Sequence, residues 1–419
     1  MAIQEALLDK PRKSIPKTFW LILSLAAIIS SSALIATHLK KPTSFFHFSS
    51  APNLCQHALD TEACLTHVSE VVQGPTLAST KDHKLSTLIS LLTKSTTHIQ
   101  EVMNRANVIK RRVNGPREET ALNDCEQLMD LSMDRVWESV LTLTKNNVES
   151  QQDAHTWLSS VLTNHATCLD GLEGASRAVM ENDLEDLISR ARSSLAVLVS
   201  VLPKPDHKEF IDESLNGEFT SWVSNKDRRL LESRIGDIQA NVVVAKDGSG
   251  KFKTVAEAVA TAPDNGKTRY VIYVKRGTYK EKVEIGKKKT NVMLVGDGMD
   301  ATIITGSLNF IDGTTTFNSA TVAAVGDGFI AQDIGFQNTA GPEKHQAVAL
   351  RVGADQSVIN RCKIDAFQDT LLRTSSLQNS LSNCFSTQNH FHQQVRIGFS
   401  TTIINITHTS SKLHHHHVQ

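Results

Sequence analysis

The sequence lacks an excess of charge of either sign, because 44 lysine and arginine residues balance 44 aspartate and glutamate residues over 419 positions. Balanced charge removes the usual reason to expect a nucleic-acid partner or a generally acidic ligand. CxxC pairs and histidine-rich zinc spacings are also missing, and the run His414 to His417 is interpreted as tag-like or accidental. We therefore expect a globular chain that binds neither nucleic acid nor a structural metal.

A polar face is missing from residues 19–37, which read FWLILSLAAIISSSALIAT. An uncharged run close to the ~20 residues that cross a bilayer predicts a membrane segment, either a signal anchor or a cleaved signal peptide. The basic residues before it predict that the tail 1–18 stays cytoplasmic and that the rest of the chain is translocated. They are Lys10, Arg12, Lys13 and Lys17.

Glycine is rare between residues 50 and 204, where apolar residues recur at steps of three and four. Such stripes are typical of amphipathic helices, and several in series bury their apolar faces best as an antiparallel bundle, here predicted to have four helices. The sustained heptads that a coiled coil would need are missing. One stripe consists of Leu85, Leu88, Leu92, Ile99, Met103, Ala106 and Ile109.

Six cysteines in a translocated chain favour disulfides over metal ligation. Cys55 and Cys64 lie close enough in sequence to join a short helical hairpin. Cys125 and Cys168 lie on the apolar faces of two different predicted helices, where a bridge would tie the two together. The spacing alone does not decide the pairing, because four cysteines allow three connectivities.

Residues 205–240 are polar and are predicted to be an interdomain linker. Arg228 and Arg229 lie in its second half. A dibasic pair in an exposed segment of a secretory precursor is a candidate processing site.

Between residues 241 and 372 the period changes to short β runs such as NVVVA, YVIYV, NVMLVG and AVALRVG, separated by turn signals such as DGSG and GDG. Short strands without intervening helices, spaced about one coil apart, are typical of a parallel β-helix. A β-sandwich, the alternative, would show cleaner alternation and two-residue hairpins. The fold class predicted for the chain is therefore multidomain: an all-α bundle followed by a right-handed parallel β-helix.

Several long motifs in this second half resemble the plant pectinesterases (pectin methylesterases). They include VVVAKDGSGKFKTVAEAVATAP, YVIYVKRGTYKEKVEI, TFNSATVAAVGDGFIAQDIGFQNTAGPEKHQAVALRVGADQSVINRCKIDAFQDTL. Upstream, CQHALDTEAC and NHATCLDGL resemble the pectinesterase-inhibitor domain that precedes many catalytic domains of this family. The resemblance implies the disulfides Cys55–Cys64 and Cys125–Cys168.

The resemblance implies hydrolysis of the methyl esters of pectin galacturonate by two aspartates and no cofactor. One aspartate attacks the ester carbonyl, while the other protonates methanol and then activates water. Carried onto this sequence, Asp369 is the general acid/base and Gln368 stabilises the transition state. Gln346, a second amide at the site, and Thr316 bind substrate. Because neighbours on a regular strand point to opposite faces, Gln368 and Asp369 reach one site only if the chain bends there.

The family pattern is lost after the QDTL motif, and residues 373–419 are interpreted as an aberrant tail. From Leu371 onward there is no Asp, Glu or Trp, so no nucleophilic aspartate can be named. The abrupt change is typical of a frameshifted or truncated sequence, which predicts an incomplete β-helix. Cys384 keeps roughly the family spacing from Cys362, which leaves a Cys362–Cys384 bridge open.

Three functions follow from these patterns. The first is a pectinesterase precursor of the cell wall, inactive in this chain for want of a nucleophile. The second is a noncatalytic inhibitor or binding protein that acts through its helical domain, by an intramolecular or intermolecular contact with an esterase. A β-helix lyase or galacturonase is third, because the acidic clusters that it needs are not seen.

Overall fold

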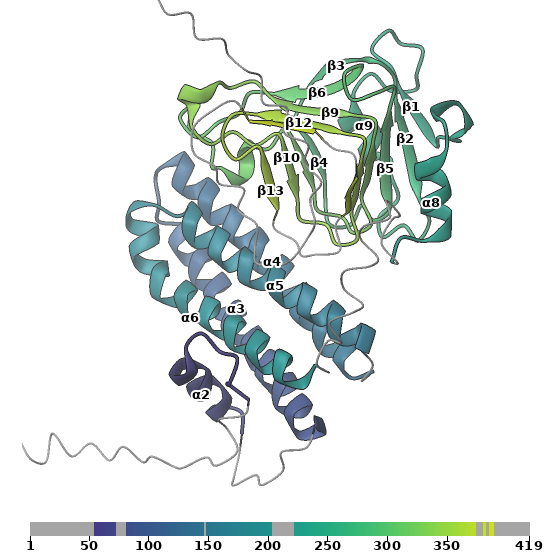
Figure 1. Cartoon of the computed structure of the whole chain (residues 1–419). Helices are drawn as coiled ribbons and strands as arrows, with labels where there is room; N and C mark the ends of the chain where they lie inside the picture. The colour runs from purple at the N-terminus through teal and green to yellow at the C-terminus, as the bar shows by residue number, and fades with distance from the viewer. Residues whose placement is uncertain are drawn as a thin grey trace, which may run out of the picture. The chain divides into compact units, whose positions relative to one another are not determined.

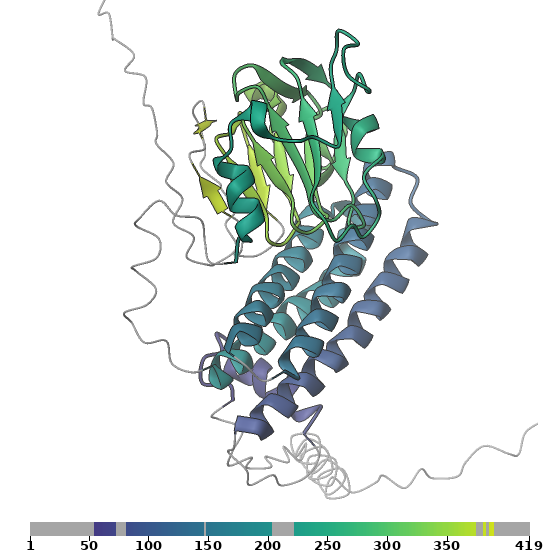
Figure 2. The same ribbon diagram turned by 90° about the vertical axis from the view of Figure 1, so that its right-hand side faces the viewer.

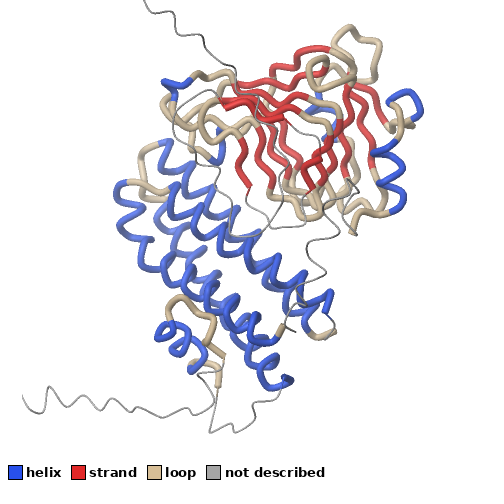
Figure 3. The backbone as a smooth tube through the Cα atoms, in the orientation of Figure 1, coloured by secondary structure: helices blue, strands red, loops and turns tan. Residues whose placement is uncertain are grey.

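The computed structural model describes residues 54–72, 81–145, 148–202, 222–373, 380–382 and 385–388. Helices fill the first part of this described chain and strands the second (Figure 3). The predicted membrane segment, residues 19–37, lies outside these ranges. Among the described residues, no helix combines the length and the apolar character needed to cross a membrane.

The first part is a bundle of four long helices that run side by side (Figures 1 and 2), preceded by one short helix. The predicted stripes form its core: Leu88, Ile99, Leu122 and Leu184 are at most 1% exposed. The helical bundle predicted from the three- and four-residue spacing is therefore confirmed. Its helices are α2 (Thr61–Ser69), α3 (Lys81–Lys110), α4 (Pro116–Leu143), α5 (Val148–Gly171) and α6 (Gly174–Val201).

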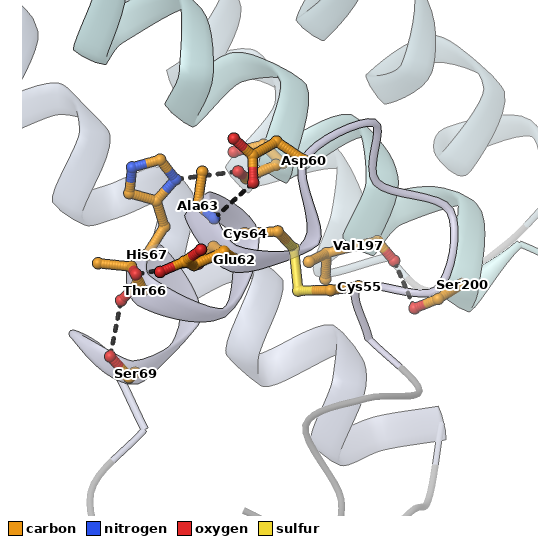
Figure 4. Close-up of a disulfide and its surroundings, with 12 residues drawn as sticks. Cys55, Asp60, Glu62, Ala63, Cys64, Thr66, His67, Ser69, Val197 and Ser200 are labelled. Atoms are coloured by element: carbon orange, nitrogen blue, oxygen red, sulfur yellow. Dashed lines mark hydrogen bonds between the residues drawn. A yellow bond between two sulfur atoms is a disulfide. The ribbon is translucent and has the colours of Figure 1, made fainter. Parts of the chain in front are cut away.

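Two disulfides close loops of different length in the bundle. Cys55–Cys64 joins residues 9 positions apart and holds the segment that leads into α2, whose first turn is capped by Asp60 (Figure 4). Cys125–Cys168 joins α4 to α5 across 43 positions. Both pairings are the ones that the family resemblance implied. Cys384 lies outside the described residues, so a bridge to the buried Cys362 stays a prediction.

Acid is expected to destabilise the bundle through His165, a fully buried residue of α5. Burial lowers the pKa of His165 from 6.5 to about 4. Between these pH values the unfolded chain binds a proton that the folded bundle does not, so the free energy of unfolding falls as pH falls. We expect urea titrations from pH 6.5 down to pH 4 to show that the wild type loses about 3 kcal/mol more than His165→Leu does.

The control for this prediction is His57→Gln, which replaces an exposed histidine of the same domain. It should keep the pH slope of the wild type. An equal slope in wild type and His165→Leu would show that other groups cause the acid sensitivity.

The second part is a parallel β-helix whose strands stack into three sheets, orders β1-β2-β5-β8-β11-β14, β3-β6-β9-β12-β15 and β4-β7-β10-β13. Each complete coil gives one strand to each sheet, and the described strands pair in parallel, as in Val322 opposite Leu350 and Leu350 opposite Leu371. The predicted β-helix is therefore confirmed. Its strands are β1 (Val242–Val244), β2 (Tyr270–Val274), β3 (Gly277–Lys280), β4 (Val283–Ile285), β5 (Val292–Gly296), β6 (Thr302–Gly306), β7 (Val322–Ala324), β8 (Ile330–Gln332), β9 (Gly335–Asn338), β10 (Leu350–Val352), β11 (Val358–Asn360), β12 (Lys363–Ala366), β13 (Leu371–Arg373), β14 (Ser380–Ser382) and β15 (Phe385–Gln388).

Aliphatic side chains and two phenylalanines fill the inside of the coils, as they do where strands of a closed stack point one face inward. Phe329, Phe336, Leu294 and Ile304 are fully buried in one core cluster. The short helix α9 (Val255–Ala260), predicted from TVAEAVATA, adds Val255 and Val259 to the same core near the first coil.

The prediction of an exposed linker over residues 205–240 is wrong for its second half. Residues 225–232 form helix α8 (Asn225–Glu232), and Leu231 is buried with Val223 against the first sheet. Arg228 and Arg229 both lie in this helix. The few apolar residues that dock it are hidden among many charges, so the composition of the segment concealed a packed helix.

The predicted end of the β-helix at residue 372 is also too early. β14 pairs in register with β11, and β15 pairs with β12, so part of a further coil follows β13. The segments SLS and FSTQ are too short and polar to carry a strand pattern of their own. They form strands because β11 and β12 of the preceding coil supply backbone hydrogen-bond partners, which the sequence of the two segments does not indicate.

Candidate active site

Two glutamines lie side by side at the edge of the third sheet. Gln346 precedes β10 and Gln368 precedes β13, and the two residues form a parallel bridge between successive coils. The amide of Ala347 donates to the carbonyl of Gln368 at 3.1 Å. The two glutamines are 22 positions apart in sequence. They lie side by side because each one precedes the third strand of its coil, and these strands pair in register.

A bend follows Gln368 at once. Asp369 has a φ of 57°, in the left-handed region that L-residues seldom adopt. Such a turn lets consecutive side chains escape the strict alternation of a strand. The chain thus turns at the point where Gln368 and Asp369 would need a bend to reach one site, and both residues are half-buried.

The side chain of Gln346 has one unsatisfied hydrogen-bonding atom among the described residues. Its side-chain oxygen Oε1 is buried, and no described residue donates a hydrogen bond to it. His345, beside it, is exposed and has a φ of 57°. An amide whose oxygen is unpartnered near a half-buried aspartate is the kind of group that a polar substrate would satisfy.

Thr316 lies on a turn that is tied to the coil of Gln346. It is the N-cap residue of the short helix η3 (Phe317–Ser319), and Ser319 Oγ donates to its carbonyl at 2.7 Å. The amide of Val348 in turn donates to Ser319 Oγ at 3.0 Å. The structure thus places Thr316 near this coil through the backbone, while it brings Gln346 and Gln368 into direct register.

Arg351 is a residue of this sheet that the sequence pattern did not single out. It lies in the middle of β10, is 2% exposed, and stacks on Phe317 with 3.6 Å between the guanidinium carbon and the ring centre. Burial lowers the pKa of Arg351 to about 10. The one charged residue in the apolar run AVALRVG was the signal that could have identified it.

A carboxylate from the helical bundle reaches the turn around η3, next to Thr316. Asp124 of α4 accepts hydrogen bonds from Thr315 Oγ1 and Asn318 Nδ2. Burial raises the pKa of Asp124 to about 7, against the opposing influence of its bond to Thr315 and of the Arg351 charge.

Two further bundle residues bind carboxylates of the β-helix. Arg135 of α4 holds Asp327 with bonds of 2.5 and 3.0 Å. The indole of Trp157 in α5 donates to Asp355 at 2.7 Å. Over the described residues, no three histidine, cysteine or acidic side chains are grouped as a metal site.

Comparison with known proteins gives two adjacent matches. Residues 49–202 match the family described as plant invertase/pectin methylesterase inhibitor, and residues 241–387 match the family described as Pectinesterase. A helical inhibitor-type domain followed by a β-helix esterase domain is the class that these matches define.

Relatives whose names contain both terms, pectinesterase and inhibitor, match most of the chain. Pectinesterase/pectinesterase inhibitor 18 of Arabidopsis thaliana is 51% identical over 377 residues, which cover 88% of this chain and 67% of the relative. The pectinesterase/pectinesterase inhibitor of Ficus pumila var. awkeotsang is 52% identical over 360 residues, with coverages of 84% and 63%. The chain belongs to the pectinesterase family.

A solved structure is also similar to part of the chain. Pectin methylesterase from carrot is 60% identical over 37% of this chain and 48% of its own, with a TM-score of 0.35. The chain spans 63% of the length of the Ficus relative.

Proposed function

We propose that the β-helix is a pectinesterase catalytic domain, which takes methyl-esterified galacturonate chains as its substrate. The observation that carries the proposal is the bridge between Gln346 and Gln368 with the left-handed bend at Asp369 directly after it. This arrangement gathers two neutral amide donors and one carboxyl group at one sheet edge. Ester hydrolysis needs such groups on the developing oxyanion and on the leaving alcohol.

Each residue has a chemical task in this proposal. Gln368 and Gln346 donate to the ester carbonyl oxygen as it gains charge, and amides do this without titrating. Asp369 protonates the departing methanol and then takes a proton from water. Thr316 contacts the sugar chain.

A second carboxylate is needed to attack the ester, and the sequence has no Asp or Glu after Asp369. We therefore propose that this chain binds pectin without turning it over. Secretion to the cell wall through residues 19–37, as an anchor or a cleaved signal, and processing at Arg228 and Arg229 belong to the same proposal.

The alternative is a noncatalytic inhibitor that acts through the bundle. Three bundle side chains that bind the β-helix support it: Asp124, Arg135 and Trp157. In that case the bundle could bind the same face of another esterase.

The test compares binding and turnover by the full chain. We expect a fully methyl-esterified hexagalacturonate to bind in calorimetry, and Gln346→Ala to weaken the binding about tenfold through the lost hydrogen bond. His345→Ala, which changes an exposed neighbour, should leave affinity unchanged. Methanol release from methyl-esterified pectin should not exceed that of Asp369→Asn.

Two outcomes would contradict the proposal. Methanol release that Asp369→Asn abolishes would show that the chain is active and has another nucleophile. Absence of binding, together with inhibition of an added active pectinesterase, would establish the inhibitor function instead.

A further inference from the structure

Asp124 of the bundle is buried against hydrogen-bond donors of the β-helix. Its two carboxylate oxygens accept from Asn318 Nδ2 and Thr315 Oγ1, each on a different oxygen. Asp124 is 6% exposed, and the nearby cations Arg351 and Lys282 both stabilise its negative charge. The β-helix therefore surrounds one carboxylate with two neutral donors and two positive charges.

Arg351 is only partly satisfied by this arrangement. Its Nε and Nη1 are buried and have no hydrogen-bond partner among the described residues. The carboxylates of Glu284 and Asp124 act on Arg351 through charge alone. The guanidinium carbon lies 3.6 Å from the centre of the Phe317 ring. A guanidinium presents a planar fork of N–H groups, which matches a carboxylate better than any neutral group.

Arg351 lies in the sheet whose edge the two glutamines border. Arg351 lies five residues beyond Gln346 on the chain that forms β10, within about 16 Å along an extended strand. It stands opposite Leu372, which follows Gln368 by four residues. A linear polysaccharide that contacts the glutamines can therefore continue toward Arg351.

We propose that Arg351, Thr315 and Asn318 form a carboxylate subsite for a demethylated galacturonate unit, and that Asp124 occupies this subsite in place of the sugar. The inference rests on the proposed function, since it assumes that galacturonate chains bind along this sheet. A methyl ester cannot fill the subsite equally well, because it carries no charge to offset a buried guanidinium. The subsite thus selects chains that already contain a free acid unit.

The test measures the affinity of the full chain for two hexagalacturonates, one fully demethylated and one fully methyl-esterified. Asp124→Ala should raise affinity for the demethylated hexamer about tenfold and change affinity for the esterified one less than twofold. Adding Arg351→Gln to Asp124→Ala should cancel the gain. Arg351→Lys in the same background should keep part of it, since the charge remains. Thermal unfolding of each variant confirms that it is folded.

The matched control is Asp130→Ala, which removes another α4 carboxylate, one that binds Lys287 at the edge of the contact. It should give no gain. An equal gain from Asp130→Ala, or an equal gain for both hexamers, would show that the bundle is merely loosened and would overturn the subsite. Binding of the esterified hexamer without any selective gain refutes the subsite alone. Failure of every variant to bind either hexamer refutes the proposed function as well.

Discussion

Gly326→Ala is expected to destabilise the β-helix severely, by about 3 kcal/mol or more. A Cβ at this position would stand 2.2 Å from the carbonyl oxygen of Lys289 and 2.9 Å from that of Gly286. Both atoms belong to the backbone of the preceding coil, so no side chain can rotate away to make room. The two coils would have to separate, which would stretch the hydrogen bonds between β4 and β7. Urea unfolding followed by circular dichroism measures the loss.

Gly286→Ala is the matched control. It lies on the facing coil, and a Cβ built there meets no atom within 4 Å. We expect a change within about 0.5 kcal/mol, as for an ordinary surface substitution. Equal stability of the two variants would mean that the spacing of the coils is not fixed at this turn.

Loss of the Cys125–Cys168 bridge is expected to lower the free energy of unfolding of the bundle by about 4 kcal/mol. The bridge spans 43 positions, and the conformational entropy that the unfolded chain gains when the bridge is removed grows with the length of the loop. Cys125→Ser with Cys168→Ser should therefore unfold at markedly lower urea concentration. The fluorescence of tryptophans in the bundle, such as Trp137 and Trp157, reports the transition.

The Cys55–Cys64 bridge provides the comparison, since it spans only 9 positions. Its replacement by two serines should cost about 2.5 kcal/mol. If the shorter loop proved as important as the longer one, the effect would come from contacts in the folded state and not from chain entropy.

The sequence predicted the parts of the fold whose residues follow one period. Leu88 and Ile99 repeat at helical steps, and runs such as YVIYV form strands because their aliphatic side chains need burial on one face. The positions of Gln346 and Gln368 were also predictable, because the family motifs carry them. Long-range contacts were not. Nothing local to Asp124 or Arg351 indicates that they approach each other, since about 230 positions separate them.

Helix α8 was not predictable for a local reason, because its composition pointed to the wrong structure. Its segment carries so many charges that composition favours a solvated linker, yet Val223 and Leu231 are buried against the first sheet. The partly buried apolar residues packed beside them include Trp222, Leu230 and Ile235. Arg228 and Arg229 are consequently part of a folded helix. A protease that cuts between them must first unwind this helix, so cleavage is expected to depend on local opening.

The parallel ladder that pairs Gln346 with Gln368 has a consequence for how such proteins diversify. Successive coils advance by different numbers of residues, 28 from Val322 to Leu350 and 21 from Leu350 to Leu371, while the strands stay in register. Length variation is therefore absorbed in the connecting turns. Each coil can therefore acquire or lose a loop without changing the strand register of the next coil. New specificity can be added in one coil at a time.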